Sequence, residues 1–197
     1  MSTPIHLRNI PWPAEIFDHP QFIASIAKWY RPNLFVEYGT GHGIATKVYA
    51  PYCKRILGVD LNHADAHKIP NLTFYQMTTR RFKTEVLDKL TETIDMAFID
   101  ADHDWKVAFQ DFEDLFPKMT ENGIIFLHDT YPCEKKWTDP IFCHDSWIVP
   151  FKIKEKYGAI CDVFTIPIQP GLTMVRKQTK DLSHMPYSQI YPKNLLY

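Results

Sequence analysis

Residues 34–43 constrain the fold of this chain more than any other stretch. They read L-F-V-E-Y-G-T-G-H-G, an apolar run of strand length with an acidic residue, followed by three glycines at alternate positions. An apolar run without polar alternation is typical of a strand buried on both faces in a parallel sheet. Glycines let the backbone turn sharply and let a ligand approach closely. Because residues 44–50 can start a helix, the segment predicts a strand, a glycine turn and a helix that cradle a nucleotide-type ligand.

The acidic residue of this run, Glu37, indicates which ligand the turn binds. In a dinucleotide fold the turn holds a pyrophosphate against a helix N-terminus, and a carboxylate at that place would repel the anion. The dinucleotide fingerprint also requires a glycine at position 44, where this chain has Ile44. An acidic cradle suits a ligand with a cationic group instead. For this stretch alone, a tight turn without any ligand is the alternative.

The turn resembles the first motif of class I S-adenosylmethionine-dependent methyltransferases, an acidic residue followed by G-x-G-x-G. S-adenosylmethionine carries a sulfonium and an α-amine and has no phosphate. The resemblance implies that this cofactor is bound by the residues Glu37, Gly39, Thr40, Gly41 and Gly43. A second strand, over residues 55–60, ends in Asp60, which by the same resemblance accepts the ribose hydroxyls. As a plain turn residue, Asp60 would instead cap a helix that starts near Asn62.

Length, charge and cysteine use describe one ordinary globular domain. The chain has 197 residues, 45% hydrophobic and 23% charged, which is enough for a sizeable core. A net charge of −1 gives no basis for binding nucleic acid or an anionic membrane. The sequence shows neither a transmembrane run nor a signal peptide, and its four cysteines form no C-x-x-C pair. We therefore expect a cytoplasmic protein with reduced thiols and a small-molecule substrate.

Strand-like and helix-like segments alternate along the chain, which predicts an α/β architecture. Further strands are expected at residues 72–75, 94–99 and 123–127, and helices at 16–29, 82–90 and 105–116. Two segments, 159–166 and 172–176, flank a connection with proline and glycine and predict an antiparallel hairpin. Methyltransferase sheets end in such a hairpin. The expected fold is therefore Rossmann-like and doubly wound, with a mostly parallel seven-stranded sheet, a C-terminal antiparallel hairpin and helices on both faces.

Polar side chains follow the fourth and fifth expected strands, and strand ends of open α/β sheets converge on one crevice. They are Asp100, Asp102, His103, Asp104, His128 and Asp129. So many ionisable groups at one sheet edge are hard to explain by packing. Carboxylates and imidazoles together suit a divalent metal ion. The alternatives are helix caps for Asp102 and Asp104, a plain loop histidine for His128 and an Asx turn for Asp129.

The spacing resembles the divalent-metal-dependent O-methyltransferases of the catechol and caffeoyl-CoA type. The family 24 methyltransferases are more similar still, since their pattern I-D-x-D-H, then G-x-I-x-x-H-D, matches residues 99–129. The resemblance implies that Asp100, His128 and Asp129 bind Mg²⁺, Mn²⁺ or Fe²⁺, and that Asp100 also serves catalysis and the cofactor site. His128 stands where the metal-dependent enzymes have Asp, which favours Mn²⁺, Fe²⁺ or Zn²⁺ over Mg²⁺. His103 stands where they have the lysine base, which implies a base with a nearly neutral pKa.

We expect one methyltransferase domain over residues 1–177, with a helical cover at 1–33, a substrate lid at 131–148 and an extended tail at 178–197. The lid contains Tyr131, Trp137, Phe142 and Trp147 among a few charged residues. Such a composition suits a sugar, polyketide or phenolic acceptor, and equally a contact between two copies of the chain.

The predicted activity is methyl transfer from S-adenosylmethionine to a hydroxyl of a small molecule, assisted by a divalent metal. Two other classes stay open from the sequence. One is a non-catalytic binding protein of this fold, which would have no chemical need for the cluster of acids and histidines. The other is an NAD-dependent oxidoreductase, which Glu37 and Ile44 disfavour.

Overall fold

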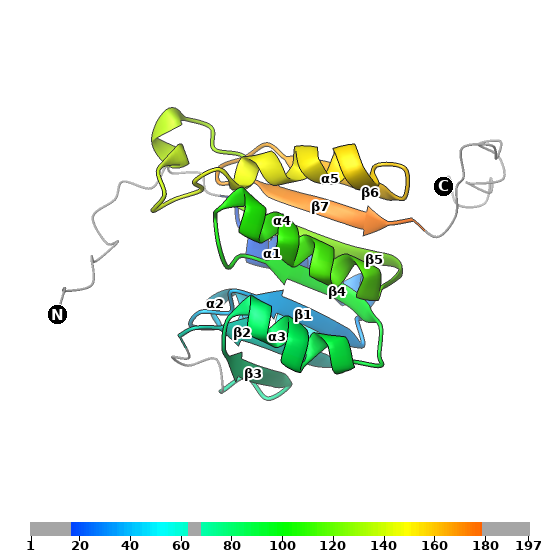
Figure 1. Ribbon diagram of the computed structural model, residues 1–197. Helices are drawn as coiled ribbons and strands as arrows, with labels where there is room; N and C mark the ends of the chain where they lie inside the picture. Colours follow the sequence, from blue (N-terminus) through cyan, green and yellow to red (C-terminus); the bar gives the residue numbers. More distant parts are fainter. Residues whose placement is uncertain (1–16, 63–67, 179–197) are drawn as a thin grey trace, which may run out of the picture.

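The computed structural model describes residues 17–62 and 68–178, which form a seven-stranded sheet between two layers of helices (Figure 1). The strand order is β3-β2-β1-β4-β5-β7-β6. The strands are β1 (Leu34–Tyr38), β2 (Arg55–Asp60), β3 (Leu72–Gln76), β4 (Ile94–Ile99), β5 (Met119–His128), β6 (Cys161–Ile166) and β7 (Leu172–Lys177). Strands β1 to β5 pair in parallel, and β7 runs antiparallel to both β5 and β6. This topology confirms the expected fold class, including the hairpin at the end.

Five α-helices within residues 17–62 and 68–178 cover the two faces of the sheet. They are α1 (His19–Tyr30), α2 (Ile44–Tyr49), α3 (Thr79–Glu85), α4 (Trp105–Leu115) and α5 (Val149–Tyr157). Helices α3, α4 and α5 lie in front of the sheet in Figure 1 and share one hydrophobic core with it, while α1 and α2 lie behind it over a second core. No helix within the described residues is long and apolar enough to cross a membrane.

Strand β1 shows how the sequence builds both cores. All five of its residues are buried, as the apolar run predicted. Because side chains alternate between the faces of a strand, Val36 and Tyr38 enter the core under α3 to α5, and Phe35 enters the core under α1 and α2. Glu37 shares the face of Phe35 and therefore points toward α2. The central strand thus carries one buried carboxyl group among apolar side chains.

Two element boundaries and one whole helix differ from the sequence-based expectation. Helix α3 begins at Thr79, because the hydroxyl of Thr78 caps it by accepting from the Arg81 amide. The helix ends at Glu85, and a separate 3₁₀ turn follows at Leu87–Lys89. Strand β5 begins at Met119 rather than at residue 123, since the turn-like residues before Gly123 lie in an irregularity of its pairing with β4. Helix α5 was not predicted, and the helix expected near residue 62 falls mostly outside the described residues.

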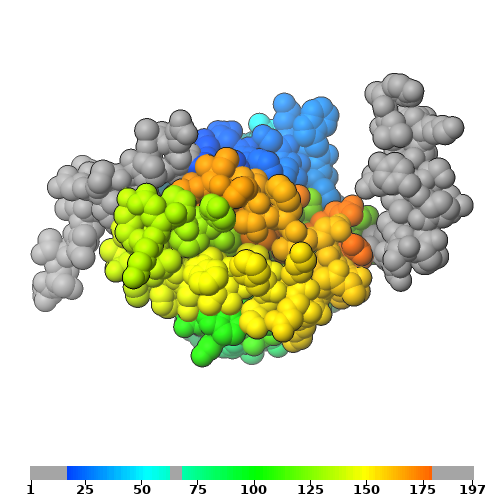
Figure 2. Space-filling model, turned by 90° about the horizontal axis from the view of Figure 1, so that it is seen from above, coloured from blue at the N-terminus to red at the C-terminus, as the bar shows by residue number. Residues whose placement is uncertain are grey.

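The lid expected at 131–148 contains two 3₁₀ turns, Lys135–Thr138 and Ser146–Ile148. It lies beside the connection between β6 and β7, because the Cys133 amide donates to the side chain of Gln169. Figure 2 shows this segment in yellow-green next to the orange hairpin, with α1 in blue behind them. The division into domain, cover, lid and tail stays a prediction, since residues 1–16 and 179–197 lie outside the described part.

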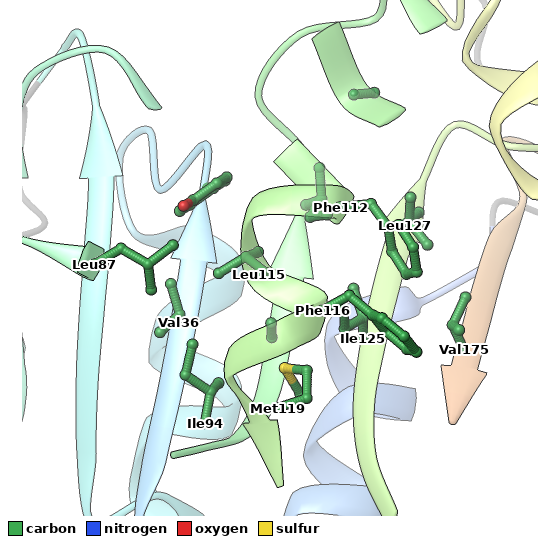
Figure 3. Packing of buried hydrophobic residues seen from close by; sticks show 14 of the residues in the cluster. Val36, Leu87, Ile94, Phe112, Leu115, Phe116, Met119, Ile125, Leu127 and Val175 are labelled. Carbon is green, nitrogen blue, oxygen red and sulfur yellow. The ribbon is translucent and has the colours of Figure 1, made fainter. Parts of the chain in front are cut away.

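Phe112 of α4 is fully buried in the core between α4, α5 and the sheet (Figure 3). Its ring packs against Phe116 and Tyr157 at centroid distances of 5.1 and 5.5 Å. Replacing Phe112 with Ala removes these contacts and leaves a cavity, so we expect the free energy of unfolding to fall by about 3–5 kcal/mol. Denaturant unfolding measures this change. The matched control is Phe164→Ala on β6, whose ring is 59% exposed, and equal losses in the two variants would contradict the assignment of the core.

Candidate functional site

The glycine turn after β1 packs against the end of β4. Gly39, Gly41 and Gly43 all have positive φ angles, of 89°, 50° and 70°, which residues with a side chain rarely adopt. A Cβ atom on Gly39 would lie 2.0 Å from the backbone oxygen of Asp100, whereas one on Gly41 would meet nothing within 4 Å. The turn therefore touches β4 with one glycine and leaves open space beside another.

The carboxyl group of Glu37 lies behind this turn rather than in it. Only 1% of the residue is exposed, and its two oxygens accept hydrogen bonds from the hydroxyls of Thr46, at 2.8 Å, and Tyr49. Burial raises the pKa of Glu37 to about 7, although the two hydroxyl donors oppose that shift. Glu37 thus ties α2 to the central strand, and its contact with a cofactor stays a prediction.

Thr40 is also turned inward, since its hydroxyl would lie 2.5 Å from a Cβ atom on Gly58 of β2. The side chain of Thr40 therefore fills the space that this glycine leaves in the sheet. The turn offers a ligand its backbone at this position, not a hydroxyl group.

Asp60 lies at the end of β2, next to the glycine turn. Its carboxylate accepts from the Gly41 amide at 2.8 Å and from the Asn62 amide at 2.9 Å. Asp60 and Gly39 line a cavity of about 310 Å³ at the carboxyl ends of β1, β2 and β4, together with Leu61, Met77, Ala101 and Asp102. The structure thus brings the predicted ribose-binding residue to the same hollow as the first glycine of the turn.

A second group of side chains gathers at the ends of β4 and β5. His128 Nδ1 lies 3.1 Å from Asp100 Oδ1 and 3.2 Å from Asp129 Oδ2. His103 Nε2 lies 2.9 Å from the same oxygen of Asp129 and 3.9 Å from Asp100 Oδ1. We call these four residues the Asp–His cluster. It contains all the predicted metal ligands and also His103, the predicted base.

The cluster is electrically balanced by its own groups. Burial opposes charge on both histidines, yet the attraction and hydrogen bonds of Asp100 and Asp129 raise the pKa values of His103 and His128 to about 10. The same contacts outweigh burial and hold the pKa values of Asp100 and Asp129 below their ordinary range. Two imidazolium and two carboxylate groups therefore neutralise one another in a poorly hydrated place.

The 131–148 segment holds this cluster in place. The carbonyl of Phe142 contacts His103 Nδ1, and the Cys143 thiol lies 3.4 Å from Asp129 Oδ1 as a donor. Asp129 itself has a φ angle of 58°, which is unusual for a residue other than glycine, and the Ser146 hydroxyl donates to its carbonyl oxygen. This segment thus fixes both sides of the cluster.

Asp102 and Asp104 have local roles. Asp104 is the N-cap of α4 and accepts from the Lys106 amide at 2.8 Å, and Asp102 accepts from the Asp104 amide at 2.9 Å. Both therefore shape the loop that carries His103 into the cluster, as the capping alternative for Asp104 predicted.

The Asp–His cluster forms one wall of a cavity of about 480 Å³. The remaining walls are His19, Trp137, Ile141, Phe142, Cys143, Gln169 and Pro170. Sequence analysis missed His19, whose ring centroid lies 3.9 Å from that of His128. Burial, together with the nearby charge of His128, lowers the pKa of His19 to about 4. No sequence pattern connects His19, the first residue of α1, with the ends of β4 and β5.

The part of the chain that carries the site is similar to a known family. A family model described as a methyltransferase domain matches residues 36–130, which include every predicted site residue but not His19. An uncharacterized protein of Sinorhizobium fredii, y4gI, is 25% identical over 167 residues. That match covers 66% of this chain but only 17% of the relative, so the chain spans about a sixth of that protein's length.

Solved structures share the fold. An O-methyltransferase from Bacillus cereus in complex with SAH superposes with a TM-score of 0.67 at 14% identity, over 84% of each chain. The O-methyltransferase TomG from Streptomyces achromogenes, in complex with SAM, gives a TM-score of 0.64 at 12% identity, over 87% of this chain and 84% of that one. At such identities the likeness establishes the fold alone.

The buried carboxyl group of Glu37 predicts how stability depends on pH. Its pKa is about 7 in the folded protein against an ordinary value of 4.5, so the folded state holds a proton that the unfolded state has lost. As the pH rises from about 4.5 to about 7, we expect the free energy of unfolding of the wild type to fall by up to roughly 3 kcal/mol relative to that of Glu37→Gln. Well above pH 7 we expect no further change. Denaturant unfolding at a series of pH values measures the difference. The exposed Glu121→Gln is the control, and a difference for Glu37→Gln that does not vary with pH would refute the prediction.

Proposed function

We propose that this chain transfers the methyl group of S-adenosylmethionine to a hydroxyl group of a small molecule, since residues 36–130 match a methyltransferase-domain model and the chain shares its fold with an O-methyltransferase. The observation that carries this proposal is that consecutive residues at the end of β4 line two cavities. Asp100 lines the larger cavity, and the next two residues, Ala101 and Asp102, line the smaller one. A cofactor in one and an acceptor in the other would meet beside Asp100.

The smaller cavity suits the cofactor. Each carboxylate oxygen of Asp60 accepts one amide hydrogen bond and retains a lone pair, so both can accept from the two ribose hydroxyls. The open space beside Gly41 lets a ligand approach the backbone of the turn. The SAH and SAM complexes of the two O-methyltransferases with this fold support S-adenosylmethionine as the ligand.

The larger cavity suits the acceptor. Trp137, Ile141, Phe142 and Pro170 give it apolar walls, and the Asp–His cluster gives it one strongly polar wall. A ligand with a flat or apolar body and a hydroxyl group matches both surfaces, as a phenol, a polyketide or a sugar does. A chain with a net charge of −1 supports such a small molecule rather than a nucleic acid. Bringing the hydroxyl in line with the methyl group would supply most of the acceleration.

The donor groups of the Asp–His cluster fit a divalent metal. Asp100, His128 and Asp129 would hold it, with carboxylate oxygens and an imidazole nitrogen that suit Mn²⁺ or Fe²⁺ better than Mg²⁺. When bound, such an ion would orient the acceptor hydroxyl and lower its pKa. His103 reaches the same two carboxylates through Nε2, so its expected role as the proton acceptor competes with a role as a ligand.

Cofactor binding is tested by Asp60→Asn. The variant keeps an oxygen that can accept from one backbone amide, but it loses the negative charge that strengthens hydrogen bonds from the ribose hydroxyls. We therefore expect the affinity for S-adenosylmethionine to fall roughly tenfold. Isothermal titration calorimetry measures it, with the exposed Asp88→Asn as the matched control. Unchanged affinity in Asp60→Asn would show that the cofactor does not use this carboxylate.

Methyl transfer is tested by His128→Ala, with a panel of phenolic, sugar and polyketide acceptors and detection of S-adenosylhomocysteine. We expect kcat to fall at least 10²-fold while the affinity for S-adenosylmethionine changes less than threefold, because His128 lines the acceptor cavity and not the cofactor cavity. A variant that turns over at the wild-type rate would remove the cluster from the mechanism.

A further inference from the structure

We propose that His103 is a metal ligand, so that the Asp–His cluster is a site of two imidazoles and two carboxylates that prefers transition-metal ions to Mg²⁺. The inference rests on the metal site of the proposed function and changes the role of one residue in it. The family resemblance gives His103 the place of a base, and the contacts around its two ring nitrogens argue for coordination instead.

The first argument is the orientation of the His103 ring. Its Nδ1 contacts the carbonyl oxygen of Phe142, and a carbonyl can only accept, so Nδ1 must carry a hydrogen. In the neutral ring the lone pair is therefore on Nε2, which faces Asp129 and Asp100. Histidines that bind metals almost always donate the other ring N–H to a carbonyl or a carboxylate in this way. The lid thus fixes the tautomer that a ligand needs.

The second argument is the spacing of the donor atoms. His103 Nε2, His128 Nδ1, Asp100 Oδ1 and Asp129 Oδ2 are joined by contacts of 2.9, 3.1, 3.2 and 3.9 Å. Ligands about 2.0–2.2 Å from one ion are separated from one another by roughly 3–3.5 Å. The donor atoms of Asp100, His103 and Asp129 lie within 4.8 Å of one another and form one of the two groups of potential metal ligands within the described residues. His128 Nδ1 contacts both carboxylates of this group.

His19 is the competing fourth ligand, because it forms the other group with Asp100 and His128. Its contact with the cluster is a tilted ring, with 3.9 Å between its centroid and that of His128, whereas His103 meets a carboxylate oxygen at 2.9 Å. His19 also lies outside the matched methyltransferase domain. These contacts favour His103 as the ligand and give His19 the role of packing against the ring of His128.

The donor set predicts which ions bind. Two imidazole nitrogens favour Mn²⁺, Co²⁺ and Zn²⁺, in rising order, over Mg²⁺, which prefers oxygen. If His103 were a free base instead, the site would be left with one nitrogen and would discriminate less between these ions.

The test is metal binding by the full chain after removal of bound metal with EDTA, measured by titration calorimetry with Zn²⁺, Mn²⁺ and Mg²⁺ and by visible absorption with Co²⁺. We expect His103→Ala to weaken Zn²⁺ binding by more than tenfold and to shift the Co²⁺ bands, since losing even an outer partner of a ligand costs about 10–100-fold. We expect His19→Gln to change the affinity less than threefold. His144→Gln is the matched control, because His144 lies in the segment 131–148, pairs with Asp145 and does not line the cavity.

Circular dichroism and thermal unfolding establish that each variant is folded. Zn²⁺ binding that is lost in His128→Ala but kept in His103→Ala would overturn the ligand role of His103 and leave the proposed metal site intact. Loss in His19→Gln with retention in His103→Ala would assign the fourth ligand to His19 and overturn the inference. A wild-type chain that binds S-adenosylmethionine but none of the four ions would overturn it as well, without affecting the cofactor assignment.

Discussion

The contact between Gly39 and the end of β4 is the constraint on which the site depends. The backbone of Gly39 approaches the Asp100 carbonyl so closely that no side chain fits between them. This contact fixes the turn that faces the smaller cavity directly beside the strand that carries Asp100 to the larger one. Two hollows that could lie anywhere along a sheet edge are thereby lined by consecutive residues at the end of β4. A reaction between two bound molecules requires their reacting groups to be held at contact distance, so this proximity matters for the proposed chemistry.

The Asp–His cluster has a different physical basis. Four ionisable side chains from the ends of β4 and β5 and from the loop before α4 are stable there only because their charges cancel. An unpaired charge in such a place would cost several kcal/mol, so each member depends on the others. The lid contributes hydrogen-bond partners rather than charge: the Phe142 carbonyl for His103, the Cys143 thiol for Asp129. The segment 131–148 therefore contacts both sides of the cluster.

The sequence predicted those features that a strand and its end determine. Apolar runs identified the central strands, and polar residues directly after them, such as Asp60, Asp100 and Asp129, had to lie at one edge because parallel strands share a direction. What it could not predict depends on contacts between distant segments. The approach of His19 to His128, and of the lid to His103, follows from tertiary packing that no local pattern encodes. Helix α5 was not predicted, because only three of its residues are buried and its apolar face is narrow.

Glu37 shows how a correct conclusion can rest on an incomplete reason. The sequence argument used its charge to disfavour a pyrophosphate, yet the carboxyl group lies behind the turn, bonded to Thr46 and Tyr49, with a pKa near 7. The Glu37 carboxyl group therefore contributes little to the electrostatic argument against a pyrophosphate. What separates this chain from a dinucleotide-binding fold is the sheet itself, where β7 enters antiparallel between β5 and β6. That insertion brings the connection with Gln169 and Pro170 to the end of β5, where it closes one wall of the larger cavity. The hairpin thus distinguishes the fold and shapes the place where a second substrate would bind.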